Sequence, residues 1–342
     1  MKILVTCDPE IPVPPKLYGG VERLVDGLVT AYAKKGHEVY LLANPGSTAK
    51  GARKIFHFPA LFSRGYLNVF RNAVKLFKVY HKVKPDVIHS FSRLLYTYPL
   101  LFTSKVPFLQ TYGRFISPHS TKLASVIGGK RMNFTSAAAH MLNHLKDNRK
   151  FTPVYNFIDT NYFVPDDNAS KEYLMFLGRI EEIKGTRECI DIAIATNTKL
   201  IIAGNIQPGH DEYFNTQIKP WLGHPLIEYV GSVNNEQKLY YLQRAKAFLF
   251  PIKWEEPFGI VMAEAMACGV PVIGFNRGSV PEVVENAKTG FVVNNISEMI
   301  DALNKIDLID RQEVRNDCVE RFSVEVIADQ YLRLLQKLSS LS

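Results

Sequence analysis

Short apolar runs alternate with longer amphipathic stretches along the whole chain. The short runs are rich in Val, Ile, Leu and Phe, as buried strands are, and the stretches between them have helical spacing. In the first half, strands are predicted at 3–5, 39–42, 87–89, 108–110, 133–136 and 154–155, and helices at 20–35, 64–84, 119–127 and 137–147. In the second half, strands are predicted at 173–177, 200–203, 227–230, 248–250, 272–274 and 291–293, and helices at 187–196, 210–219, 235–244, 258–267, 296–304 and 311–320.

This alternation predicts an α/β fold with parallel, doubly wound sheets. The 342 residues exceed what one hydrophobic core usually fills, so two Rossmann-like domains are expected. The polar, proline-containing stretch 161–170 places the boundary between a domain 1–165 and a domain 166–323. A last helix, with Ser323 as its cap, occupies 324–342. Because open α/β sheets bind ligands beyond the carboxyl ends of their strands, two facing sheets would define a cleft.

Composition narrows the class of protein. The 46% apolar and 22% charged residues are typical of a soluble enzyme. The four cysteines stand far apart, without a Cys-x-x-Cys pair or a histidine cluster, so neither a metal site nor a disulfide framework is expected and a reducing cytoplasm fits. No signal peptide and no run of 18 apolar residues occurs, so we expect a cytoplasmic protein that does not span a membrane.

The net charge of +8 is distributed unevenly. Residues 1–165 hold 23 Lys and Arg against 8 Asp and Glu, whereas residues 166–342 hold 18 against 25. Such asymmetry predicts an anionic partner for the first half, although a solvated basic face is the alternative.

One predicted helix concentrates this charge. The stretch 64–82 carries a cationic stripe made of Arg71, Lys75, Lys78 and Lys82. An apolar stripe consists of Leu67, Phe70, Val74 and Phe77, and together with Ala73 and Tyr80 it is expected to face a sheet. Basic amphipathic helices bind anionic lipid surfaces, so we expect peripheral attachment to the inner face of a membrane, while a phosphate-rich polymer would satisfy the charges equally well.

Two glutamates eight residues apart mark the helix predicted at 258–267. Pro257 suits the first helical position, which puts Glu256 beside the positive end of the helix dipole, and Gly269 ends the helix. At ~1.5 Å rise per residue, the carboxylates of Glu256 and Glu264 would lie roughly 12 Å apart along the axis. Carboxylates only accept hydrogen bonds, so the pair suits an uncharged ligand rich in hydroxyl groups.

Two cations follow the strand at 173–177. Gly178 and Arg179 come directly after it, and Lys184 follows five residues later. A guanidinium and an ammonium at one strand end suit a pyrophosphate group. The alternative is a solvated loop in which Glu181 and Glu182 pair with these cations.

A glycine pair stands before the first predicted helix. Gly19 and Gly20, in the loop 16–22, would let backbone N–H groups approach an anion at the helix N-terminus, and a plain tight turn is the alternative. The loop is not G-x-G-x-x-G, and no acidic residue ends the strand 39–42, which argues against a nicotinamide dinucleotide site.

Together the run Glu256-Pro-Phe-Gly through Glu264 to Val272, the Gly-Arg and Lys-Gly pair and the glycine loop resemble retaining GT-B enzymes of glycosyltransferase family 4. The resemblance spans about residues 1–335 and implies that the last helix crosses back onto the first domain. It implies transfer of a hexosyl unit from a UDP- or GDP-sugar, without a metal or other cofactor, to an acceptor glycan or lipid, possibly lipid-linked. Nucleic acid is not an expected partner.

The resemblance also implies roles for particular residues. Glu256 would hold sugar hydroxyls, Glu264 ribose hydroxyls, and Arg179 and Lys184 the diphosphate, so the implied catalytic residues are Arg179, Lys184 and Glu256. The implied donor-binding residues are Gly19, Gly20, Gly178, Arg179, Lys184, Glu256, Pro257, Phe258, Gly259, Ile260 and Glu264. The turn 276–282 is similar to the family's turn beside the donor sugar.

The acceptor side departs from the family pattern. The family often has a histidine after the strand at 108–110, whereas here Tyr112 and Arg114 follow and His119 comes later. We therefore expect Tyr112, Arg114, His119 and, from the preceding strand, His89 near the acceptor, although a satisfied core histidine is the alternative for His89. Two other functions remain open: a nucleotide-sugar epimerase on the same frame and a non-catalytic module that binds sugar or lipid.

Overall fold

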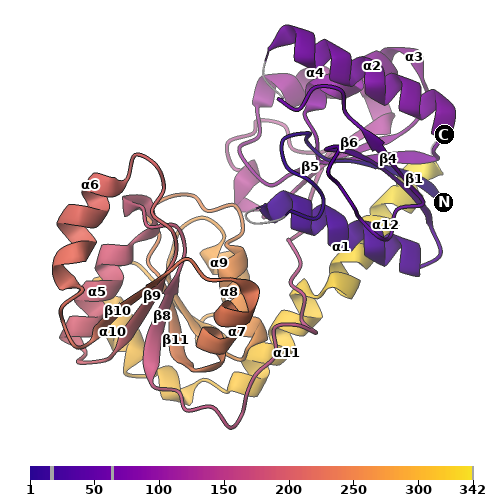
Figure 1. Ribbon diagram of the computed structural model, residues 1–342. Coiled ribbons are helices and arrows are strands. Elements are labelled where there is room, and N and C mark those ends of the chain that lie inside the picture. The colour runs from indigo at the N-terminus through magenta and orange to yellow at the C-terminus, as the bar shows by residue number, and fades with distance from the viewer. Residues whose placement is uncertain (16–18, 63–64, 341–342) are drawn as a thin grey trace. The chain divides into compact units, whose positions relative to one another are not determined.

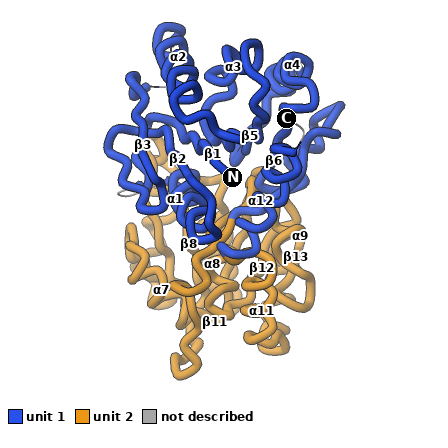
Figure 2. Tube along the Cα trace, turned by 90° about the vertical axis from the view of Figure 1, so that its right-hand side faces the viewer, with its two compact units in different colours: residues 1–156, 324–342 blue, residues 157–323 orange. Residues whose placement is uncertain are grey.

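The structure is a computed structural model that describes residues 1–15, 19–62 and 65–340. The chain forms two compact units (Figure 2), one of residues 1–156 and 324–342 and the other of residues 157–323. It enters the second unit after Asn156, earlier than the boundary predicted at 165, and returns to the first at Val324, where the last helix was expected to begin. Lys16 of the predicted glycine loop and Arg64 of the predicted basic helix lie outside the described residues.

Unit 1 is built on seven parallel strands in the order β3-β2-β1-β4-β5-β6-β7. The strands are β1 (Lys2–Thr6), β2 (Glu38–Ala43), β3 (Lys54–His57), β4 (Val87–Ser90), β5 (Phe108–Tyr112), β6 (Met132–Ser136) and β7 (Phe151–Pro153). The short edge strand β3 was not predicted, and β7 lies just before the strand predicted at 154–155. Strand order reverses between β1 and β4, which places the switch point of this sheet there.

Five α-helices cover the two faces of this sheet. They are α1 (Gly20–Lys34), α2 (Tyr66–Val83), α3 (Tyr98–Thr103), α4 (Pro118–Gly128) and α12 (Val324–Ser339). In Figure 1, α1 and α12 lie on one face, and α2, α3 and α4 form a layer on the other. Lys35 and Asp329 join α1 to α12 through an ion pair of 2.7 Å. The helix predicted at 137–147 is wrong, since only a 3-10 turn, His140–Leu142, forms there.

Unit 2 has a six-stranded parallel sheet in the order β10-β9-β8-β11-β12-β13. Its strands are β8 (Tyr173–Leu177), β9 (Leu200–Ala203), β10 (Ile227–Gly231), β11 (Ala245–Phe250), β12 (Val272–Phe275) and β13 (Gly290–Val293). All are within a few residues of their predicted positions. Strand order reverses between the neighbours β8 and β11. Parallel, doubly wound sheets are thereby confirmed in both halves of the chain.

The helices of unit 2 agree less closely with the prediction. They are α5 (Thr186–Ala195), α6 (Asp211–Tyr213), α7 (Asn235–Gln243), α8 (Ile260–Ala267), α9 (Val280–Val283), α10 (Ile296–Leu303) and α11 (Arg311–Phe322). The helix predicted at 210–219 is a single α-turn that continues as a π-helix, Phe214–Ile218. Gly269 has φ +70° just beyond α8, as the predicted helix stop requires.

The central strands are buried on both faces, as expected of parallel sheets covered by helices. All residues of β4 and β8 are buried, and tightly packed rings such as those of Phe134 and Phe176 fill the space beneath the helices. In the described ranges, no helix is both long enough and apolar enough to cross a bilayer.

The predicted orientation of α2 is wrong for its first turns and correct in part further along. Leu67 and Phe70, which were expected to face the sheet, are 61% and 66% exposed. Ala73 is buried as predicted, and Phe77 and Tyr80 pack against the core, but the rest of the buried face consists of Asn72, Leu76, Val79 and Val83. The reason is Asn72, whose amide group accepts from the Ala60 backbone N–H at 3.1 Å and donates to the Ala60 carbonyl at 3.0 Å. A satisfied polar side chain therefore sets the rotation of the helix about its axis, and hydrophobic periodicity does not reveal it.

Candidate functional site

The switch point of unit 2 brings two loops together. Strands β8 and β11 are neighbours in the sheet, so the loop 178–185 after β8 and the loop 251–259 after β11 begin at the same edge. A parallel sheet covered on both faces leaves this edge as its natural binding position. The predicted residues Gly178, Arg179, Lys184 and Glu256 all lie in these two loops.

Two glycines let these loops approach backbone to backbone. Gly185 has φ +77°, and a Cβ there would lie 2.1 Å from the carbonyl oxygen of Pro251. Gly278, in the loop after β12, has φ +53°, and a Cβ there would lie 2.4 Å from the backbone nitrogen of Glu256. Only glycine fits either position. The loops that follow β8, β11 and β12 therefore form one packed assembly.

Lys184 and Glu256 meet within this assembly. The Lys184 ammonium donates to Glu256 Oε2, and the two side chains are 12% and 14% exposed. Trp254 Nε1 donates to the same oxygen at 3.0 Å, and the ammonium also lies 4.7 Å from the centre of the Trp254 ring. The predicted cation and the predicted carboxylate are thus held in fixed positions, each by the other and by one aromatic side chain.

Arg179 lies at the start of the same loop and is more accessible. Its Nη1 is 3.1 Å from Oε1 of Glu181, and its side chain is 35% exposed. Glu182 does not pair with Lys184; its nearest cation is Lys253, at 3.8 Å. The alternative of a solvated loop whose acids neutralise both cations therefore holds for Arg179 and fails for Lys184, which is 12% exposed and paired with Glu256.

Glu264 lies on α8 and is almost fully buried. Its Oε1 accepts from the Lys238 ammonium of α7 at 2.6 Å. The other oxygen, Oε2, is buried and has no hydrogen-bond partner in the described part of the chain. Because an unsatisfied buried carboxylate oxygen is costly, this atom marks a position where a donor group from outside the chain would be stabilised.

The predicted relation of the two glutamates needs correction. Helix α8 begins at Ile260 after Gly259, which has φ +71°, so Pro257 is not its first residue and Glu256 precedes the helix. The spacing of about 12 Å along one helix axis does not apply, since Glu256 belongs to the loop after β11. Phe258 packs its buried ring against Phe322 at 5.5 Å, so its side chain belongs to the hydrophobic core.

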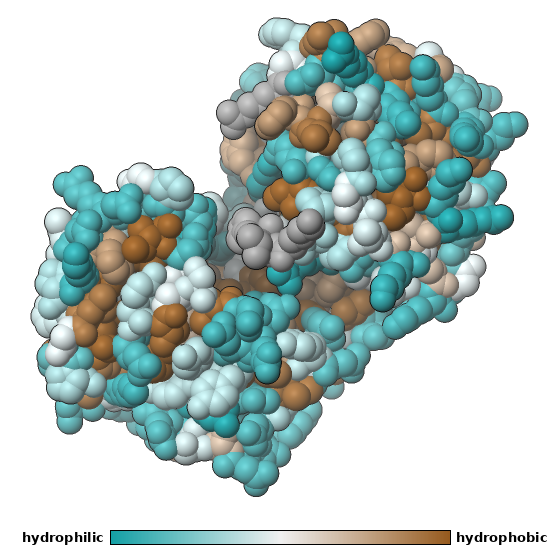
Figure 3. All heavy atoms as spheres, in the orientation of Figure 1, coloured by the Kyte–Doolittle hydropathy of each residue, from teal (hydrophilic) through white to brown (hydrophobic). Residues whose placement is uncertain are grey.

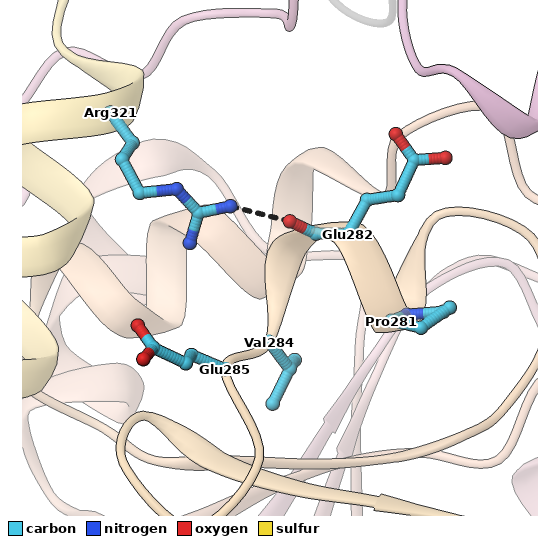
Figure 4. Close-up of a pocket in the computed structure, with 5 residues that line it drawn as sticks. All are labelled: Pro281, Glu282, Val284, Glu285 and Arg321. Carbon is cyan, nitrogen blue, oxygen red and sulfur yellow. Dashed lines mark hydrogen bonds between the residues drawn. The ribbon is translucent and has the colours of Figure 1, made fainter.

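The turn after β12 is tied to the end of α11. Figure 4 shows a pocket of about 200 Å³ lined by Pro281, Glu282, Val284, Glu285 and Arg321. The Arg321 guanidinium donates to the backbone carbonyls of Glu282 and Val283, the latter at 3.1 Å, while the Glu282 carboxylate points away from it. Arg321 therefore fixes the backbone of the predicted sugar-side turn and leaves the Glu282 carboxylate pointing elsewhere.

The glycine loop of unit 1 stands beside two carboxylates. Gly19 caps α1, and Gly20 is the first residue of that helix. Glu22 lies in its first turn, 8% exposed, and Asp8 follows β1. Burial raises the pKa of both carboxyls above their usual range, although the Arg114 guanidinium opposes this. A phosphate bound here would have to avoid these two carboxylates, and backbone N–H groups at the start of α1 are the donors that it could use.

The residues expected near the acceptor lie in different environments. Arg114 donates to Asp8 Oδ2 at 2.9 Å, at the switch point of the unit 1 sheet. Tyr112 ends β5 with its ring stacked on Phe134, and burial raises its pKa. His119 is exposed in the first turn of α4. Of the four expected residues, Tyr112 and Arg114 lie at the carboxyl end of β5, and Arg114 is the one that pairs there with Asp8.

His89 is a core residue. It is fully buried in β4, with Nδ1 3.1 Å from the Tyr32 hydroxyl and Nε2 2.9 Å from the Thr111 hydroxyl. Its ring also lies 4.8 Å from that of Tyr331 on α12. Burial lowers its pKa to about 3. A neutral imidazole with both nitrogens engaged cannot reach an acceptor, so we assign His89 a structural role.

His89 should make the stability of the protein depend on pH. The folded state keeps the ring neutral to about pH 3, whereas the unfolded chain protonates it below about pH 6.5, so stability is lost as the pH falls through this window. Between about pH 7 and pH 5 the loss amounts to about 2 kcal/mol. Urea unfolding of the parent and of His89→Gln tests this, and the difference between the two in the free energy of unfolding should shrink by about that amount as the pH falls. A constant difference would contradict the assignment.

Two residues of the site were missed from the sequence. Lys238 pairs with Glu264 but belongs to a different helix, and no local pattern connects them. Trp254 was detectable, because it is one of only two tryptophans in the chain and lies two residues before Glu256 in the same loop. The described residues contain no group of three or more His, Cys, Asp or Glu side chains that could hold a metal ion.

Comparison with known proteins agrees with this geometry. The model of glycosyl transferases group 1 matches residues 158–322, which is almost all of unit 2. The model of glycosyltransferase family 4 matches residues 18–127 in unit 1. The N-acetyl-alpha-D-glucosaminyl L-malate synthase of Bacillus anthracis is 24% identical over 231 residues, which cover 60% of this chain and 59% of the synthase. For the first relatives, the matched region covers between 46% and 59% of their own length.

Solved structures share the fold over the full length. Sucrose-phosphate synthase from Thermosynechococcus elongatus superposes with a TM-score of 0.80 at 19% identity, covering all of both chains. HepE of Anabaena in complex with UDP superposes with a TM-score of 0.77 at 18% identity, covering 98% of this chain and all of that one. Together with the two family models, these similarities show that the chain belongs to the family 4 glycosyltransferases and has their GT-B architecture.

Proposed function

We propose that this glycosyltransferase moves a hexosyl unit from a nucleoside-diphosphate sugar to an acceptor hydroxyl with retention of configuration at the sugar. The donor would bind to unit 2 and the acceptor to unit 1. The observation that carries the proposal is the joint placement of Lys184, Glu256 and Arg179 at the switch point of the unit 2 sheet. UDP is the first nucleotide to test, since HepE, which shares the fold, binds it.

Charge supplies the chemistry in this proposal. As the bond between sugar and diphosphate breaks, negative charge accumulates on the leaving group. Arg179 offers a partly exposed planar guanidinium, and Lys184 offers an ammonium that is already oriented by Glu256 and Trp254. Positioned cations lower the barrier because they do not have to reorganise during the reaction. The two would neutralise the diphosphate, so the proposal includes neither a metal nor another cofactor.

The two glutamates would hold the ends of the donor. Glu264 presents the unpartnered Oε2, which suits a ribose hydroxyl as donor. Glu256 already accepts from Lys184 and Trp254 on one oxygen, and this leaves its other oxygen for a sugar hydroxyl. Both groups select hydroxyl-rich ligands, because a ligand without hydroxyls would leave carboxylate oxygens unpaired.

The acceptor is proposed to be a glycan or a lipid, with a lipid-linked phosphate as the first candidate. The excess of cations in residues 1–165 favours an anionic acceptor or an acceptor presented on an anionic surface. The epimerase alternative predicts turnover of the donor without an acceptor. The binding-module alternative predicts tight nucleotide binding without turnover.

A calorimetric screen of UDP-, GDP- and ADP-sugars, followed by an assay of donor consumption with and without candidate acceptors, tests the proposal. We expect one nucleotide to bind well above the others and acceptor-dependent release of the nucleoside diphosphate. The anomeric configuration of the product, read by NMR, decides between retention and inversion. Binding of no nucleotide-sugar at all would contradict the proposal.

A further inference from the structure

The outer side of α2 carries exposed apolar side chains. Tyr66, Leu67 and Phe70 are 97%, 61% and 66% exposed, although all three are large and hydrophobic. Asn72 holds the opposite side of the helix against Ala60, so this exposure follows from how the helix is anchored. Three large apolar side chains exposed within five residues of one helix make this face a candidate interaction site.

A stripe of cations lies next to these side chains. At about 100° per residue, Arg71, Lys75, Lys78 and Lys82 fall within about 60° of one another, beside the apolar stripe and away from the buried face. In the part of the chain that the structure describes, none of the four forms an ion pair. The outward side of α2 therefore presents one apolar stripe and one cationic stripe in parallel.

The neighbouring helices extend this surface. Helix α3 contacts both α2 and α4, and the three form one layer on the sheet of unit 1 (Figures 1 and 2). Phe102 on α3 and Val126 on α4 are 69% and 73% exposed. Figure 3 shows hydrophobic atoms dispersed among hydrophilic ones on this unit. Residues 39–146, which include the whole layer, contain 16 Lys and Arg but only one acid, Asp86.

We propose that the α2–α3–α4 layer of unit 1 docks on an anionic lipid bilayer. Tyr66, Leu67 and Phe70 would enter the interface between headgroups and acyl chains, and the four cations of α2 would contact lipid phosphates. A bilayer satisfies both stripes at once. A soluble polyanion would leave the apolar stripe in water, and a second copy of this chain would bring like charges together.

Docking goes beyond the proposed function because it needs neither donor nor acceptor. It would place unit 1 at a surface that carries lipid-linked acceptors. Its failure in the test below would leave the proposed sugar transfer unaffected, because nucleotide binding is measured separately on the same proteins.

Co-sedimentation of the full chain with vesicles tests the proposal. The vesicles are either pure phosphatidylcholine or equal parts of phosphatidylcholine and phosphatidylglycerol. We expect binding to the anionic vesicles only, and binding that weakens at high salt because screening shortens the range of the charges. Changing the four cations of α2 to glutamine should lower the partition coefficient at least about 100-fold, since each contributes a factor of roughly five.

A second variant distinguishes a bilayer from a polyanion. The triple change Tyr66→Ser, Leu67→Ser and Phe70→Ser keeps every charge, yet it should weaken vesicle binding at least about 10-fold because the apolar insertion is lost. The matched control is Leu308→Ser, which removes a side chain that is 83% exposed in unit 2 and should leave binding unchanged. No vesicle binding by the parent would overturn the proposal. Parent-like binding by the triple variant, together with equal binding of both to heparin, would overturn it in favour of a polyanion.

Discussion

Replacing Arg179 or Lys184 with alanine is expected to lower the rate of sugar transfer by a factor of about 100 or more. Removing one positioned charge from a transition state costs on the order of 3 kcal/mol in an environment that excludes water. Lys184 is 12% exposed and already oriented by Glu256 and Trp254, so water can replace its ammonium only partly. The measurement is kcat with the donor and acceptor identified by screening.

Lys199→Ala serves as the matched control. Lys199 also belongs to unit 2 and forms an ion pair, with Glu228 at 2.7 Å, but both side chains are nearly half exposed and lie outside the loops after β8 and β11. Its kcat should stay within about two-fold of the parent, because exposed ion pairs contribute little. Thermal unfolding of each variant separates loss of catalysis from loss of fold. A kcat close to the parent value in either site variant would refute its role at the diphosphate.

Changing each glutamate to glutamine is expected to affect different steps. Glu264→Gln should weaken binding of the free nucleoside diphosphate about 10-fold or more, since the ribose hydroxyls lose a charged acceptor. Glu256→Gln should lower kcat more than it lowers that affinity, since its carboxylate lies beside Lys184 at the expected sugar position. Calorimetry with the nucleoside diphosphate and steady-state kinetics with the sugar donor measure the two effects.

The thermal stability of Glu256→Gln and Glu264→Gln is measured separately from their nucleotide affinity. Glu264→Gln leaves the Lys238 ammonium without its charged partner, so the melting temperature is measured alongside affinity. Glu228→Gln, which removes one member of an exposed ion pair, provides the control for loss of a carboxylate in unit 2. Equal changes in nucleoside diphosphate affinity for Glu256→Gln and Glu264→Gln would refute the division of roles.

The sequence alone predicted most of the architecture. Strands such as β8 and β11 are continuous apolar runs, because a parallel strand is buried on both faces, and such runs are visible without any tertiary information. Alternation of these runs with amphipathic stretches was enough to predict two parallel sheets. The candidate residues Arg179, Lys184, Glu256 and Glu264 were also selected from the sequence, because glycine and proline stand in the segments 178–185 and 256–271 that contain them.

The tertiary structure decided where the helices begin and which partners their side chains contact. Helix α8 begins at Ile260, after Gly259, and the loop before it is packed against Gly278 of the loop after β12, a contact that is not local in the sequence. The partners Lys184 with Glu256 and Lys238 with Glu264 come from elements far apart in the chain. Periodicity along one segment cannot report such pairs.

Helix α2 shows most clearly which features the sequence predicts and which the tertiary structure decides. Its length and its amphipathic character were predictable, since both depend on spacing within the helix. Which side faces the sheet was decided by the two hydrogen bonds that Asn72 and Ala60 exchange, one donated by each residue, and by the small side chain of Ala73 beside Asn72. A buried polar group must find its partners, and this requirement outweighs the burial of Leu67 and Phe70, which therefore remain exposed on the surface of unit 1.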